Sequence, residues 1–308
     1  MDRDSHIQPG DRSPHLFPDA FYTAPLDVWA TAIQRVPSEA EKCLIEQVVH
    51  YKALSDMEHE FLVVHACHPS GSKVVLGVDR NADVLTAAQQ HAGPTETAGP
   101  SSPLVSSARY LSTLMRFGPS PPSPEAYDSV QVSHDATPAP ILAQHGPSVP
   151  LSTVSFSRAP RPSLLHLSVL LLTIRTHFPS YALLQYQCYF FARATCLALV
   201  DISGGIEVQH EEGQRAATWR GVHVSLYSAG RAALQNMLLL PLAEFPVLIV
   251  PAGLFAVYSA VKLYDGNVVE SEVDRRRISD EKIREHAIPP KYHAAWQIFV
   301  RDSATVRK

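Results

Sequence analysis

The chain has 308 residues, of which 45% are hydrophobic and 18% are charged. This composition indicates a globular protein with one large or two ordinary domains. The formal net charge is −4 and both signs are scattered along the chain, so we expect no nucleic-acid partner. The first ten residues are polar and lack the apolar segment of a secretory signal, which favours a cytoplasmic location.

The cysteines indicate reduced thiols rather than a disulfide framework. Four cysteines are too few and too irregularly spaced for such a framework, and no pair has the spacing of a common zinc motif. They are Cys43, Cys67, Cys188 and Cys196. The last two cannot pair within one helix, because eight residues at a rise of ~1.5 Å separate them by about 12 Å.

The N-terminal part of the chain predicts a tail, a helix and a strand. Residues 1–25 are rich in Pro, Asp and His, which favours a disordered tail. Residues 26–35 favour a short helix, ended by the Val-Pro pair that follows. The β-branched residues within 43–53 favour a strand, although a helix over residues 39–52 also fits the pattern.

The clearest hairpin of the sequence follows. Two runs, residues 59–66 and 73–80, contain many valines and flank the turn sequence His-Pro-Ser-Gly-Ser. This pattern is typical of two antiparallel strands joined by a tight turn. Alternation predicts that His59 and Phe61 share one face of the first strand, with Glu60 and Leu62 on the other.

The register of this hairpin decides whether Asp79 can reach His59. Pairing centred on Ser70 would place Asp79 opposite Phe61 and diagonal to His59, roughly 7–8 Å apart at the origins of the side chains. A shift of one residue would turn Asp79 to the far face. Asp79 is therefore predicted to be a partner of His59 only if the hairpin has the register centred on Ser70.

A segment rich in Pro and Ser interrupts the chain after the hairpin. Roughly half of the 25 prolines lie between Pro94 and Pro162, and we expect a disordered insertion over about residues 84–126. Two strand-like runs follow, over residues 128–134 and 151–156.

Two apolar helices are predicted next. Ser163 can cap a helix over residues 164–177 that is apolar almost all round. After a Pro-Ser break, apolar residues at helical spacing extend over residues 188–200. Cys188 thus opens a buried helix, where free N–H groups and the helix dipole favour a thiolate. The alternative interpretation is that Cys188 is a small apolar residue of the core.

Residues 226–308 form a hydrophobic and charged C-terminal extension. Within it, Phe245 to Val261 contains 17 residues without a charge, at the lower edge of the length that spans a bilayer. Three prolines in and before this stretch count against one straight span, although membrane helices tolerate proline. Membrane attachment through Phe245 to Val261 is one interpretation, and a hydrophobic hairpin or helix over the core is the other.

Neither a metal ion nor a cofactor is expected. His59, His65, Cys67 and His68 have the side chains of zinc ligands. However, consecutive residues of a strand point to opposite faces, and the spacing matches no common zinc pattern.

Together these elements predict an α+β fold for residues 26–225. A small antiparallel sheet is expected to pack on the two buried helices over residues 164–177 and 188–200. The predicted strands lie near residues 45, 60, 75, 130 and 153.

A histidine that opens a buried strand, followed by a cysteine that opens a buried helix, resembles the circularly permuted papain-like proteins of the NlpC/P60 superfamily, which include the lecithin retinol acyltransferase-like group. The runs His59-Glu-Phe-Leu-Val-Val64 and Gln187-Cys188-Tyr189-Phe190-Phe191 carry the resemblance. Fungal proteins with the same His-Glu-Phe and Gln-Cys-Tyr-Phe-Phe-Ala features are also similar. The resemblance covers at most residues 43–200.

This resemblance implies a thiol hydrolase or acyltransferase that attacks an amide or ester carbonyl and forms a Cys thioester. Cys188 would be the nucleophile, His59 the general base and Asp79 the residue that orients the imidazole. The chain departs from the family at Gln187, where asparagine is usual, and in lacking the Glu-His pair after the cysteine. A non-catalytic binding or scaffold protein with the same fold is therefore the alternative function.

Overall fold

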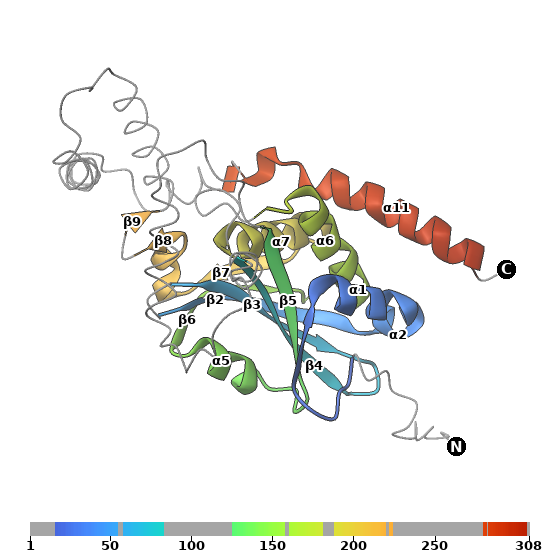
Figure 1. The fold of residues 1–308 in the computed structure, drawn as a ribbon, viewed down its shortest axis with the longest axis horizontal. Coiled ribbons are helices and arrows are strands. Elements are labelled where there is room, and N and C mark those ends of the chain that lie inside the picture. Colours follow the sequence, from blue (N-terminus) through green and yellow to red (C-terminus); the bar gives the residue numbers. More distant parts are fainter. Residues whose placement is uncertain are drawn as a thin grey trace, which may run out of the picture.

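The computed structural model describes residues 16–54, 58–82, 125–157, 160–180, 188–219, 222–223, 280–281 and 283–306. These residues form an α+β fold around a seven-stranded antiparallel sheet with the order β1-β5-β4-β3-β2-β6-β7 (Figure 1). The strands are β1 Tyr22–Pro25, β2 Leu44–Ala53, β3 Glu60–Cys67, β4 Lys73–Ala82, β5 Ala126–Ser133, β6 Ser148–Ser155 and β7 Ile206–Gln209. The five predicted strands are confirmed, and β1 and β7 extend the sheet at its two edges.

Helices cover both faces of this sheet within the described residues. They are α1 Leu26–Arg35, α2 Pro37–Lys42, α5 Ala139–His145, α6 Leu164–His177, α7 Cys188–Ser203 and α11 Ile288–Val306. A 3-10 helix, η2 Glu211–Arg215, and a short pair, β8 Thr218–Trp219 with β9 Val222–His223, follow α7 in the chain. The predicted cap of α6 is confirmed, because the Ser163 hydroxyl accepts a hydrogen bond from the backbone N–H of His166.

The two faces of β3 pack against different elements, as the alternation predicts. Leu62 and Val64 belong to the main core, which also contains residues of α1, α6, α7 and α11. Phe61 and Val63 lie in a smaller core on the opposite face, together with Ile141 of α5. The helix α7 packs directly on β2, β3 and β4, whereas α6 packs against α7 and the outer helices α1, α2 and α11.

The register of the β3–β4 hairpin is the one centred on Ser70. Leu62 pairs with Val78, and the pairing continues in step to Cys67 and Lys73. The same register places Asp79 across from Phe61 and on a diagonal from His59. The prediction on which the candidate site depends is therefore confirmed.

The expectation of a disordered N-terminal tail is corrected for residues 16–25. Leu16 is 1% exposed, and β1 pairs with β5, with Tyr22 opposite Val132. Pairing of β1 satisfies the backbone groups along the edge of β5, which would otherwise be open. Residues 1–15 lie outside the described part of the chain.

Two sequence predictions fall on residues that are not described. The proposed insertion over about residues 84–126 is described only from residue 125, where β5 is about to begin. The apolar stretch Phe245 to Val261 also lies outside the described ranges. Within those ranges, none of the helices combines the length and apolar character needed to cross a bilayer.

A buried ion pair connects the sheet to Phe178 at the end of α6. Arg80 of β4 forms two hydrogen bonds with Asp128 of β5, at 2.7 and 2.8 Å, and both side chains are 0% exposed. Arg80 also donates to the backbone carbonyl of Phe178 at 3.0 Å, and its guanidinium lies 4.6 Å from the ring centre of Phe191 in α7. One arginine therefore links β4 and β5 to the end of α6 and to the first turn of α7.

Replacing the carboxylate should show how strongly the fold depends on this pair. We expect Asp128→Asn to lower the free energy of unfolding by about 3–5 kcal/mol, because it leaves Arg80 buried without a counter-charge. The control is Asp201→Asn, whose partner Arg284 is half exposed and whose loss should cost at most about 1 kcal/mol. Urea unfolding followed by circular dichroism measures both, and equal losses would contradict this account.

Candidate functional site

His59 lies directly before β3, where the backbone holds it in a defined place. The preceding Glu58 has φ of 44°, a left-handed conformation that costs non-glycine residues about 1–2 kcal/mol. The carbonyl of His59 accepts a hydrogen bond from the N–H of Ala53 at 2.7 Å, which ties it to the end of β2. The His59 side chain is 15% exposed, so it is reachable at the edge of the core.

A buried ionic cluster supports the strand at the residue next to His59. Glu60 Oε1 accepts a hydrogen bond from the N–H of Ala217 at 2.8 Å, and the Nζ atom of buried Lys52 donates to the carbonyl of Thr218 at 2.5 Å. Burial alone would raise the pKa of Glu60, but the hydrogen bond and charge of His50 and the charge of Lys52 lower it. The start of β3 is thereby fixed to β2 and to the segment after η2.

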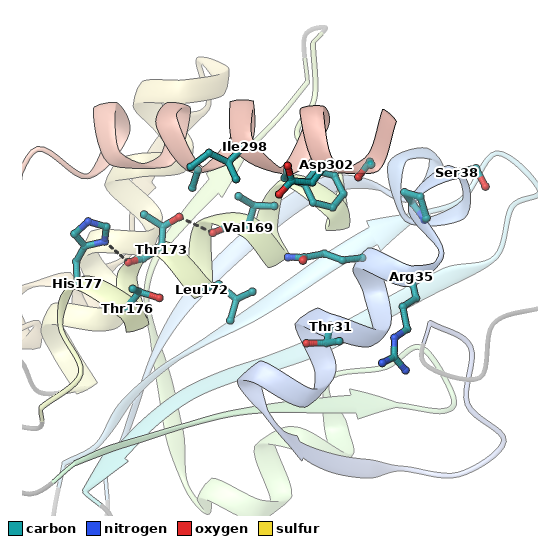
Figure 2. Close-up of a pocket in the computed structure, with 15 residues that line it drawn as sticks. Thr31, Arg35, Ser38, Val169, Leu172, Thr173, Thr176, His177, Ile298 and Asp302 are labelled. Carbon is teal, nitrogen blue, oxygen red and sulfur yellow. Dashed lines mark hydrogen bonds between the residues drawn. The ribbon is translucent and has the colours of Figure 1, made fainter. Parts of the chain in front are cut away.

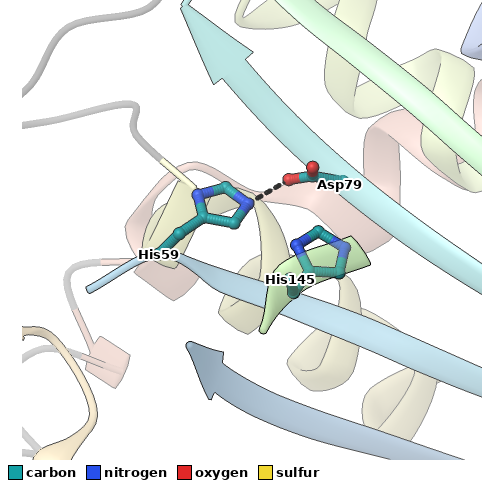
Figure 3. Close-up of side chains that lie close together, drawn as sticks. All are labelled: His59, Asp79 and His145. Atoms are coloured by element: carbon teal, nitrogen blue, oxygen red, sulfur yellow. Dashed lines mark hydrogen bonds and ion pairs between the residues drawn. The ribbon is translucent and has the colours of Figure 1, made fainter. Parts of the chain in front are cut away.

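Asp79 of β4 is hydrogen-bonded to Nε2 of His59 (Figure 3). The Nδ2 amide of Asn81 donates to the second carboxylate oxygen at 2.7 Å. Burial alone would raise the pKa of Asp79, but the charge of His59, its hydrogen bond and the charge of His145 outweigh burial and lower the pKa. Asp79 is thus a buried carboxylate held ionised beside an imidazole.

Cys188 is the first residue of α7 and is 8% exposed. Burial alone would lower the pKa of His59, but the charges of Asp79 and Cys188, and hydrogen bonds to both side chains, raise it well above its ordinary value. Cys188 therefore lies near the same imidazole as Asp79. The three residues that the sequence singles out thus lie in one region of the structure.

A second imidazole, His145, lies beside this group and is not predicted from the sequence. His145 ends α5, and its ring is stacked on Phe61 with ring centres 3.8 Å apart. It also lies parallel to the His59 ring, with centres 5.7 Å apart. Burial lowers the pKa of His145; the charge of Asp79 opposes this effect, and that of His59 adds to it. No motif in the sequence joins His145 to His59, because only the packing of α5 on the sheet makes them neighbours.

The four metal-ligand candidates of the sequence do not gather around one point. His68 lies in the turn after β3 and hydrogen-bonds to Ser70 at 2.8 Å. His59 instead lies with Asp79 and His145, and one potential ligand atom from each of these three lies within 4.8 Å of the other two (Figure 3).

A pocket lies elsewhere, among α1, α2, α6 and α11 (Figure 2). Its volume is about 1040 Å³, and it is lined by polar groups such as Gln34 and Asp302 as well as by Leu172 and Phe299. Neither Cys188 nor the residues around His59 line it. This pocket and the candidate catalytic group are therefore separate features.

Comparison of the chain with protein-family models, with curated proteins and with solved structures finds no match. The likeness to the NlpC/P60 superfamily is untested by these comparisons and stays a prediction.

The position of His145 depends on a glycine in β4. A Cβ atom on Gly77 would lie 2.7 Å from Cγ2 of Ile141 and 3.0 Å from Oε1 of Gln131, so α5 can approach the sheet only because residue 77 has no side chain. Ile141 lies four residues before His145 in the same helix.

We expect Gly77→Ala to lower the free energy of unfolding by about 1–3 kcal/mol through overpacking. Without this contact, the same substitution in a strand would stabilise the protein by about 0.4–1 kcal/mol, so the sign of the change is diagnostic. Urea unfolding of Gly77→Ala, Ile141→Ala and the double variant measures the effect. The double variant should lose less free energy of unfolding than the two single variants together, because Ile141→Ala removes the clashing methyl group. Simple additivity of the two losses would contradict the proposed contact.

Proposed function

We propose that the protein is a thiol hydrolase or acyltransferase of papain-like mechanism, with Cys188 as nucleophile, His59 as general base and Asp79 as the orienting carboxylate. The observation that carries the proposal is the position of His59 between two partners. Its imidazole is hydrogen-bonded to the buried carboxylate of Asp79, and it lies near enough to the thiol at the start of α7 for the charge of Cys188 to raise its pKa. A nucleophile, a base and an orienting group in this order are the parts that thiol catalysis requires.

The arrangement assigns a separate role to each ring nitrogen. Asp79 bonds to Nε2, which leaves Nδ1 as the nitrogen for the Cys188 sulfur. The carboxylate stabilises the imidazolium that forms when the thiol proton is transferred, and it holds the ring in one orientation. The positive end of the α7 helix dipole favours negative charge on the sulfur.

Transfer of the thiol proton to His59 leaves a thiolate beside an imidazolium, and acyl chemistry follows from this ion pair. The thiolate attacks an amide or ester carbonyl, and the Cys188 backbone N–H helps to stabilise the oxyanion. His59 then gives its proton to the leaving amine or alcohol, which yields a thioester on Cys188. Attack by water on the thioester gives hydrolysis, whereas attack by another nucleophile gives acyl transfer.

Selective alkylation of the four thiols tests the proposal. We expect iodoacetamide to label Cys188 of the folded chain faster than the other cysteines, because it is paired with His59 and is not fully enclosed. Cys43 and Cys196 are 0% exposed, and burial, with the nearby charges of Glu39 and Cys67, raises the pKa of Cys43 to about 12. Peptide mass spectrometry after short exposures measures the four rates.

Variants of the base separate catalytic pairing from simple accessibility. His59→Ala should slow the labelling of Cys188 at neutral pH by about tenfold or more, because only a few per cent of an ordinary thiol is then ionised. Asp79→Asn should slow it less, since the imidazole keeps its place. His65→Ala is the matched control on the same strand and should leave the rate of Cys188 unchanged. Equal labelling of all four thiols, or no effect of His59→Ala, would favour a non-catalytic binding or scaffold protein.

A further inference from the structure

We propose that His59, Asp79 and His145 form a binding site for a divalent transition-metal ion of the zinc type, and that the bound ion turns off the thiol at Cys188. The first part of the proposal is independent of catalysis. The second part rests on the proposed function, because it requires His59 to act on Cys188.

The donor set fits zinc. Two imidazole nitrogens and a carboxylate oxygen are ligands that zinc prefers, at about 2.0–2.2 Å from the ion. Tetrahedral geometry at these bond lengths places the ligand atoms about 3.4 Å from one another. The three potential ligand atoms lie within 4.8 Å of one another, so side-chain shifts of about 1 Å bring them to an ion.

The three ligands come from elements that already hold them in place. Asp79 lies in β4, which is paired on both sides by β3 and β5. The His145 ring is stacked on Phe61, and its Nε2 atom lies 3.3 Å from the side-chain amide of Gln131. Asn81 supports the second oxygen of Asp79. Such outer contacts orient metal ligands and strengthen metal binding.

A bound ion would act on Cys188 through His59, because the thiol lies near the same imidazole. Three protein ligands leave the fourth position of a tetrahedral zinc ion to water. A neutral imidazole has a single nitrogen lone pair. Once the ion holds that lone pair, His59 can no longer accept the proton of the thiol.

His145 makes the site testable without changing the proposed catalytic residues. His145→Phe keeps an aromatic ring to stack on Phe61 but has no ligand nitrogen. His145→Gln is a second variant in case the larger ring disturbs packing. His65→Ala is the matched control, since it removes a half-buried imidazole from the same strand as Phe61 but outside the cluster.

Zinc binding is measured on the full chain after removal of metal with a chelator, by competition with a chromogenic zinc indicator. We expect one tight site in the wild-type chain and in His65→Ala, and at least a tenfold weaker site in both His145 variants. Cys188→Ala should retain binding, because it leaves all three ligands unchanged. Equal affinity of wild type and the His145 variants would overturn the proposal, since the zinc would then be bound elsewhere.

The effect on the thiol is measured as the ratio of iodoacetamide labelling rates at Cys188 without and with zinc. We expect zinc to slow labelling at least tenfold in the wild-type chain and to have little effect in His145→Phe. Binding without protection would overturn the inhibitory role. If Cys188 is unreactive even without zinc, the proposed catalytic function fails, whereas the indicator competition still decides the metal site on its own.

Discussion

The pairing register of β3 and β4 is the constraint on which the candidate site depends. With Leu62 opposite Val78, Asp79 is carried to the face and level at which it bonds to His59. A shift by one residue would turn Asp79 into the main core and Arg80 out of it. Two buried ionic contacts, on opposite faces of the sheet, would then be lost together.

This coupling explains why consecutive charged residues can be buried in the same strand. Asp79 faces the α5 side, where His59 is its partner, while Arg80 faces the α7 side, where Asp128 and the carbonyl of Phe178 satisfy it. A buried ion pair contributes little net stability, but leaving one member unpaired is costly. The pair at Arg80 therefore penalises alternative registers, and the same penalty keeps the site assembled. The arginine also contacts Phe178 after α6 and Phe191 in the first turn of α7, so that fold specificity and the position of α7 share one residue.

The sequence is sufficient to predict the parts of the fold that follow from local patterns. The turn centred on Ser70 and the alternating valines define the hairpin, and Ser163 with an apolar run defines α6. Those patterns also single out His59, Asp79 and Cys188. They do not reveal β1, because its four residues acquire strand structure only by pairing with β5. They do not reveal His145 either, since its place depends on Gly77 allowing α5 to contact the sheet, a long-range effect without a local signal.

The features that would make His59 a base in the proposed mechanism also favour the binding of a metal ion there. A base must keep a lone pair available, and a buried carboxylate beside it increases its attraction for any cation, whether a proton or a metal ion. In a site with only His59 and Asp79, a metal ion would have two protein ligands and would bind weakly. His145 adds the third, and its rigid stacking on Phe61 means that little conformational entropy is lost when it binds an ion. His59 and Asp79 belong both to the proposed catalytic group with Cys188 and to the proposed metal site with His145. Because His145 lies in α5, the balance between thiol chemistry and metal binding depends on where α5 packs. Movement of that helix is therefore the structural change that would favour one function over the other.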